Sequence, residues 1–122
     1  MLQLNKQSKL MHRNGNFNLS KSERYALESE LGYLTGNIDD TGWNWNYDKY
    51  EQLFQSYTDK EQKTIKELYE LISDERNWPE VSEKILSEDE ILLIQKVIND
   101  MIENNLIDEE NQYDIANILD KI

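Results

Sequence analysis

The sequence predicts a mainly α-helical fold, a compact bundle of about five helices. Ahead of three apolar segments, a Ser or Thr is followed three residues later by Glu, the capping-box pattern that marks a helix start. In each segment the apolar residues then recur every three or four positions, as on the buried face of a helix. The length of 122 residues suits one domain. We therefore divide the chain into 1–19, a basic polar arm or small β-hairpin, and 20–122, a single acidic helical domain.

The first helix is expected directly after this N-terminal arm. Within the arm, Asn14-Gly15 is a strong turn signal, which leaves a hairpin and a flexible arm as alternatives. Ser20 and Glu23 form the first capping box, and Gly36 is suited to the end of a helix. We expect a helix over residues 21–34. Its predicted inward side chains are Tyr25, Leu27, Leu31 and Leu34.

Two further helices are expected in the middle of the chain. A helix from about residue 48 to 57 would place aromatic side chains at i, i+4 and i+7, and this spacing predicts a buried face formed by Tyr50, Phe54 and Tyr57. Thr58 and Glu61 form the second capping box, so a helix should run from 59 to about 73. Its predicted inward side chains are Ile65, Leu68, Tyr69 and Ile72.

The most apolar helix is expected after Pro79, with a short helical turn over residues 81–86 as an option before it. Ser87 and Glu90 form the third capping box, and the apolar periodicity continues to residue 103. We expect this helix to lie at the centre of the bundle. Its predicted inward side chains are Ile91, Ile94, Val97, Ile98, Met101 and Ile102.

A last helix is expected at the C-terminus. Asn104-Asn105 should end the preceding helix, and Asp108 can cap the new one. Its predicted inward side chains are Tyr113, Ile115, Ala116, Ile118, Leu119 and Ile122.

The charge of the chain is strongly asymmetric. Residues 1–24 contain five basic residues and one acid, whereas residues 25–122 contain 24 acids and eight basic residues, and the net charge is −12. Such a charge argues against direct binding to nucleic acid, whose phosphates are met by clustered Lys and Arg, and against an anionic membrane surface. A basic protein is the expected partner.

Composition also indicates where the chain is expected to act. The sequence contains no cysteine, which suits a reducing compartment, and it shows neither an export signal nor an apolar run long enough to span a membrane. We therefore expect a cytoplasmic protein that exists as a monomer or a homodimer, since the isoleucine-rich helix at 88–103 could face a second copy.

The sequence does not predict an enzyme or a cofactor. His12 is the single histidine and has no second histidine with which to hold a metal. Residues 37–48 resemble a calcium-binding EF-hand loop in their oxygen side chains and in Gly42, but Trp45 supplies no ligand and Asp48 stands where such loops have a chelating Glu. Acidic pairs such as Asp39 and Asp40 sit where turns and helix starts explain them. We expect no catalytic, cofactor or metal site.

The candidate binding residues are aromatic and acidic. Six of the twelve aromatic residues lie between residues 43 and 57, and Trp43 and Trp45 are candidate contacts because Trp is favoured in binding hot spots; burial in the core is the alternative for both. Residues 100–120 contain seven acids and no basic residue, a charge density that approaches that of one DNA strand. The acidic candidates are Asp100, Glu103, Asp108, Glu109, Glu110 and Asp114.

These features lead to one main hypothesis and two alternatives. In size and acidity the chain is similar to phage counter-defence proteins, including anti-CRISPR and anti-restriction proteins, although no motif carries the likeness. This likeness implies a small non-enzymatic inhibitor that acts as a DNA mimic and occupies the basic groove of a larger nuclease or other nucleic-acid-processing enzyme. The alternatives are an immunity or antitoxin protein that neutralises one cognate toxin, and a regulatory protein–protein adaptor.

Overall fold

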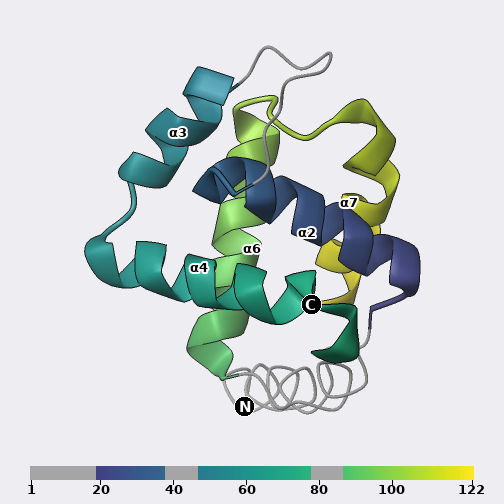
Figure 1. Ribbon diagram of the computed structural model, residues 1–122. Coiled ribbons are helices and arrows are strands. Elements are labelled where there is room, and N and C mark those ends of the chain that lie inside the picture. Colours follow the sequence, from purple (N-terminus) through teal and green to yellow (C-terminus); the bar gives the residue numbers. More distant parts are fainter. Residues whose placement is uncertain (1–18, 38–46, 78–86) are drawn as a thin grey trace, which may run out of the picture.

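The computed structural model describes residues 19–37, 47–77 and 87–122, and every regular element in these ranges is helical (Figure 1). The prediction of a mainly helical bundle is therefore confirmed. The N-terminal arm, Trp43, Trp45 and the optional turn at 81–86 lie outside the described residues. The elements are α2 (Lys21–Thr35), α3 (Tyr47–Gln55), α4 (Asp59–Ser73), the 3-10 turn η1 (Glu75–Asn77), α6 (Glu88–Glu103), the 3-10 turn η2 (Glu109–Asn111) and α7 (Gln112–Lys121).

Three helices begin at the predicted capping boxes. At the start of α2, the Ser20 backbone N–H donates to Glu23 Oε1 at 2.7 Å, and the Glu23 N–H donates to Ser20 Oγ at 3.2 Å. The same reciprocal pair of bonds starts α4 at Thr58 and α6 at Ser87. Each box satisfies two backbone groups that a helix N-terminus would otherwise leave without a partner.

Two helices end on a residue with a left-handed backbone. Gly36, with φ of 78°, ends α2, and Asn105, with φ of 56°, follows α6. After α6, the Asn105 N–H bonds to the Ile102 carbonyl at 3.0 Å and the Leu106 N–H bonds to the Met101 carbonyl at 2.9 Å, which is a Schellman motif. The motif turns the chain sharply out of α6, and residues 104–111, which include η2, lead from the upper end of α6 to the start of α7 (Figure 1).

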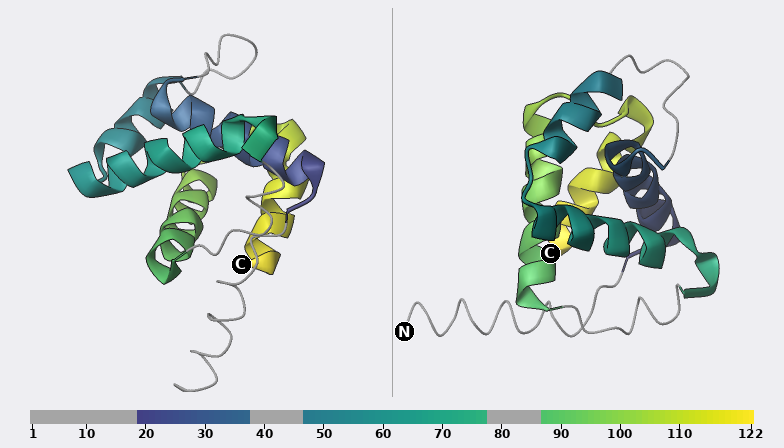
Figure 2. Two further views of the ribbon diagram at one scale, coloured as in Figure 1. Left: turned by 60° about the horizontal axis from the view of Figure 1, so that its bottom comes forward. Right: turned by 60° about the vertical axis from the view of Figure 1, so that its left-hand side comes forward.

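The helices pack as a compact bundle around α2. This helix packs against α3, α4 and α7, whereas the main neighbours of α6 are α4 and α7. The expectation that 88–103 would be the central helix is therefore wrong, because α2 makes the larger set of contacts. In Figures 1 and 2, α4 runs alongside α2 in the opposite direction and crosses α6 steeply.

A single apolar core joins all five α-helices. Tyr50 and Tyr57 are buried as predicted, while Phe54 is half-buried with Lys66 Nζ at 5.6 Å from its ring centre. The helix that carries Tyr50 ends at Gln55, two residues earlier than expected, because the chain must turn before the next helix begins at residue 59.

Several predicted inward side chains are exposed. Tyr25 is 40% exposed, Ile102 45% and Tyr113 78%, and Ala116 also faces solvent. Tyr25 lies beneath the ammonium group of Lys21 and donates its hydroxyl proton to Glu75 at the surface. These predictions were wrong because the apolar stripe of each helix is wider than the face that its neighbouring helices cover.

The predicted cap of the last helix was also wrong. The Asp108 side chain makes no capping hydrogen bond, and a 3-10 turn precedes α7. Asn111 occupies the N-cap position of α7 but does not cap it with its side chain either. Its amide is instead used inside the bundle, as described below.

Candidate functional site

The acidic candidates gather where α6 ends and α7 begins, a region that we call the C-terminal corner and define as residues 102–116. Between Lys96 and Lys121 the sequence has seven acids and no Lys or Arg. Glu103, Glu109 and Glu110 are exposed there. In Figure 1 this part of the chain, coloured yellow-green, folds back on itself beside the upper end of α6. The acids therefore lie on a turned surface rather than along one continuous helix.

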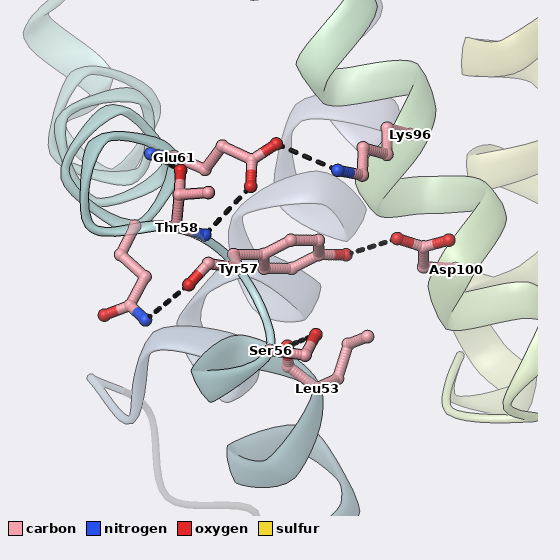
Figure 3. A network of polar contacts seen from close by, with 8 residues as sticks. Leu53, Ser56, Tyr57, Thr58, Glu61, Lys96 and Asp100 are labelled. Carbon is pink, nitrogen blue, oxygen red and sulfur yellow. Dashed lines mark hydrogen bonds and ion pairs between the residues drawn. The ribbon is translucent and has the colours of Figure 1, made fainter.

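Asp100 does not share this exposed surface. It lies on α6 one turn before the corner and is half-buried, and the hydroxyl of the buried Tyr57 donates to its Oδ2 at 2.7 Å (Figure 3). Burial and the nearby Asp100 carboxylate both raise the pKa of Tyr57 above its usual value, so the phenol keeps its proton. Asp100 thereby joins the α3–α4 junction to α6.

A second contact lies beside the first. Lys96 Nζ sits 2.9 Å from Glu61 Oε2 and 5.4 Å from the centre of the Tyr57 ring (Figure 3). Together these contacts join α6 to the α3–α4 junction and to the first turn of α4. Among the predicted acids, the structure thus assigns Asp100 a structural role.

Asp108 and Asp114 are partly covered at the edge of the corner. The hydroxyl of Ser22, in the first turn of α2, donates to Asp114 Oδ1 at 3.2 Å. The backbone N–H of Asp108 points into the protein and donates to Glu30 Oε2 at 3.3 Å. The acids whose charge is most open to solvent are therefore Glu103, Glu109 and Glu110.

A buried carboxyl holds the turn of the corner in place. Glu30, on α2, is 0% exposed and accepts hydrogen bonds on both oxygens: from the Tyr50 hydroxyl at 2.6 Å on Oε1, and from Asn111 Nδ2 at 2.7 Å and the Asp108 N–H on Oε2. The Tyr50 hydroxyl also lies within hydrogen-bonding reach of the Leu106 carbonyl. Residues 106–111 are thus tied to α2 and α3 from inside the bundle.

The pKa of Glu30 is raised from 4.5 to about 7. Burial is the main cause, because the charged form loses its water, and the hydrogen bonds from Tyr50, Asn111 and Asp108 offset part of the shift. Sequence analysis missed this residue. A signal existed, since Leu27, Glu30, Leu31 and Leu34 occupy positions i, i+3, i+4 and i+7, which places a carboxyl within the buried stripe.

An apolar groove adjoins the acids of the corner. It has a volume of about 330 Å³, near the lower end of the ~300–1,000 Å³ typical of ligand sites. Three parts of the chain line the groove: the end of α6, the loop that follows it, and the start of α7. The lining residues are Ile102, Asn105, Ile107, Gln112, Ile115 and Ala116. Of these, Ile115 and Ile107 are buried and form part of the core, while Ile102 and Ala116 are exposed.

The described residues offer neither a metal site nor a membrane span. Nowhere in the described ranges do three His, Cys, Asp or Glu side chains lie close enough together to hold a metal ion. None of the helices seen there combines the length and apolar character required to cross a bilayer. The groove and its acids are therefore the feature of the described surface on which we build a functional argument.

Comparison with known proteins gives no family to this chain: no family model, no curated protein and no solved structure matches it. We therefore infer a function from the sequence and from the geometry of the C-terminal corner.

Proposed function

We propose that the chain is a non-enzymatic inhibitor that binds a larger nucleic-acid-processing enzyme and occupies its basic groove. The observation that supports this proposal is the exposed acidic surface of the C-terminal corner: Glu103 at the end of α6, and Glu109 and Glu110 on a turn that Glu30 fixes from within. The net charge of −12 gives the whole molecule the sign that such a groove attracts.

Electrostatics provides the physical basis for the proposal. Enzymes that act on DNA or RNA carry clustered Lys and Arg that meet the phosphate backbone. An acidic surface of complementary shape would be drawn to the same cations, which mainly speeds association and selects against acidic partners. Because residues 106–111 are already fixed, binding would not require this turn to be ordered first.

The one strongly perturbed carboxyl among the described residues supports binding rather than catalysis. A catalytic acid requires a raised pKa and also access to the substrate. Glu30 has the raised pKa, but it is 0% exposed and both of its oxygens already accept hydrogen bonds. Its role in the proposed mechanism is to position the binding surface.

The proposal can be tested by capture followed by an inhibition assay. The full chain would be immobilised, exposed to lysate from cells that carry a CRISPR or restriction system, and eluted with increasing salt. We expect a nucleic-acid enzyme that elutes at moderate salt, that is displaced by its own DNA or RNA, and whose cleavage activity falls when the free protein is added. A captured enzyme that remains fully active would contradict the proposal, and recovery of a single toxin would favour the immunity alternative.

A matched pair of variants tests the role of the corner. The triple variant Glu103→Gln, Glu109→Gln, Glu110→Gln removes three charges from exposed positions of the corner. A control removes three exposed charges elsewhere, through Glu67→Gln, Glu70→Gln and Asp120→Asn. We expect the first variant to associate with the enzyme at least tenfold more slowly at low salt and the control to change little. Equal effects would show that net charge, and not this surface, drives binding.

A further inference from the structure

We propose that the groove of the C-terminal corner receives a basic amphipathic helix of a protein partner. One or two aliphatic side chains of that helix would enter the groove, and its Lys or Arg side chains would meet the acids on either side. This inference rests on the proposed function for the existence of a protein partner. It adds which part of the surface forms the desolvated contact and what chemistry the partner presents there.

The apolar character of the groove supports an apolar contact. Four of its six lining residues are aliphatic: Ile102, at 45% exposure, on the α6 wall, the buried Ile107 and Ile115, and the small, exposed Ala116 on the α7 wall. Covering these surfaces with aliphatic side chains would remove apolar area from water, which is the main favourable contribution in protein association.

A large aromatic side chain stands next to the groove. Tyr113 is 78% exposed, and it lies three residues before Ala116, so the two share a face of α7. Tyr113 and Ile102 are two of the four large hydrophobic side chains exposed in the described ranges, the others being Tyr25 and Leu92. Tyrosine is enriched among residues that dominate binding energy, and Tyr113 can pack along a helix seated in the groove.

The charges beside the groove select a basic partner. Glu103 follows the wall residue Ile102 directly, and Glu109 and Glu110 precede the lining residue Gln112 by three and two positions. A second copy of this chain would bring the same acids to the same place, and like charges placed opposite one another disfavour association. A lysine- or arginine-rich segment has the complementary charge.

The available backbone geometry favours a helix over an extended segment. An extended peptide usually binds by adding to an open sheet edge, and the described part of the chain contains no strand. A helix satisfies its own backbone groups and can lie in an apolar groove without such an edge. Side chains four residues apart on a helix are about 5–6 Å apart, which matches the ~6 Å rise along the α7 wall from Gln112 to Ala116.

Synthetic peptides provide the test. The probe is an 18-residue peptide of leucine and lysine with the leucines on one helical face. One control has the same composition with the leucines spread around the helix, and a second has glutamate in place of lysine. Binding to the full chain would be followed by NMR of isoleucine methyl groups. We expect the probe to shift the methyl signals of Ile102, Ile107 and Ile115 and to bind at least tenfold more tightly than either control.

Three substitutions locate the contact. Ile102→Gln removes apolar surface from the wall, and Ala116→Gln fills the groove with an uncharged side chain at an exposed position. Leu92→Gln is the matched control, because Leu92 lies on the same helix α6 at 47% exposure and does not line the groove. We expect the first two to weaken probe binding about tenfold and the control to change it less than twofold.

The outcomes separate this inference from the proposed function. Equal binding of the probe and the spread-leucine peptide, methyl shifts away from the groove, or equal effects of Ile102→Gln and Leu92→Gln would each overturn the groove assignment, even if the protein inhibits an enzyme. Groove binding of the probe together with an absence of any inhibited nucleic-acid enzyme would uphold the groove assignment and overturn the proposed function.

Discussion

Replacing Glu30 by glutamine should stabilise the protein at neutral and alkaline pH. The Tyr50 hydroxyl has one proton and faces two acceptors, Glu30 Oε1 and the Leu106 carbonyl. When Glu30 is protonated, its own proton can be donated to Tyr50 Oη, and Tyr50 can then donate to Leu106. The amide introduced by Glu30→Gln can make the same pattern of bonds while its oxygen accepts from Asn111 and Asp108. Glutamine therefore imitates the protonated state.

The magnitude follows from the pKa of Glu30. Its pKa is about 7 in the folded protein and 4.5 as an ordinary glutamate. Between these values the folded state binds more protons than the unfolded state, so the free energy of unfolding decreases as pH rises. The gap corresponds to about 3 kcal/mol. This stabilisation is fully present below pH 4.5 and is lost as pH rises through about 7, whereas Glu30→Gln keeps it at every pH.

Urea unfolding of the wild type and of Glu30→Gln at several pH values from 4.5 to 8.5 would measure this effect. The other carboxyls titrate in both proteins, so the informative quantity is the difference between the two free energies of unfolding. We expect this difference to be small at pH 4.5 and to reach about 3 kcal/mol in favour of the variant at pH 8.5. Glu67→Gln, at an exposed position of α4, serves as the control and should show no such trend. A variant less stable than the wild type by a constant amount at every pH would refute the reasoning, because it would mean that Glu30 is held as a carboxylate.

Three further predictions concern the stability of the fold, and each is measured by denaturant unfolding. Tyr57→Phe should lower the free energy of unfolding by about 1–2 kcal/mol because it removes the bond to Asp100, and an unchanged value would show that this bond contributes nothing net. Asn105→Ala should lower the free energy of unfolding by about 1 kcal/mol, because φ is 56° at this residue, whereas Asn105→Gly should not lower it. Equal stabilities of the two variants would argue against backbone strain at this turn. Lys121→Met should cost about 1 kcal/mol above pH 4.5, because the buried Glu23 loses its partner at 2.5 Å. Burial raises the pKa of Glu23, but the bonds from Lys121 and Ser20 outweigh burial and leave the pKa lowered. The loss of unfolding free energy in Lys121→Met should therefore disappear as pH falls below 4.5. A loss that persists in acid would contradict the ion-pair explanation.

The helix boundaries were predictable from the sequence because their causes are local. A capping box involves residues three positions apart, and α4 and α6 begin and end at the predicted residues. Asn105 likewise ends α6 by its own backbone conformation, aided by bonds to the preceding turn. Sequence reasoning was reliable at the capping boxes but not at Asp108, whose side chain makes no capping hydrogen bond before the last helix.

Side-chain environments were less predictable because they depend on contacts between distant segments. Glu30 accepts hydrogen bonds from Tyr50, 20 residues away, and from Asn111, 81 residues away. The periodicity of α7 made Tyr113 and Ala116 look like core residues, but which side of α7 is covered depends on where α2 and α6 lie. The acidic candidates of the corner were found from charge alone, whereas the groove beside them required the geometry of the turn.

The buried carboxyl and the exposed corner are best understood together. Glu30→Gln is expected to be more stable than the wild type at neutral pH, so the carboxylate charge itself is not needed for stability there. The carboxyl instead positions the turn: its bonds to Asp108 and Asn111, with the contact between Tyr50 and Leu106, fix residues 106–111. This turn carries Glu109, Glu110 and the groove residue Ile107. Departures from the most stable arrangement are expected where a protein functions. Glu30→Leu removes the buried acceptor of Asn111 Nδ2 and of the Asp108 N–H, so it should lower the free energy of unfolding and loosen residues 106–111. Probe binding to the groove should then weaken even though no groove residue has changed.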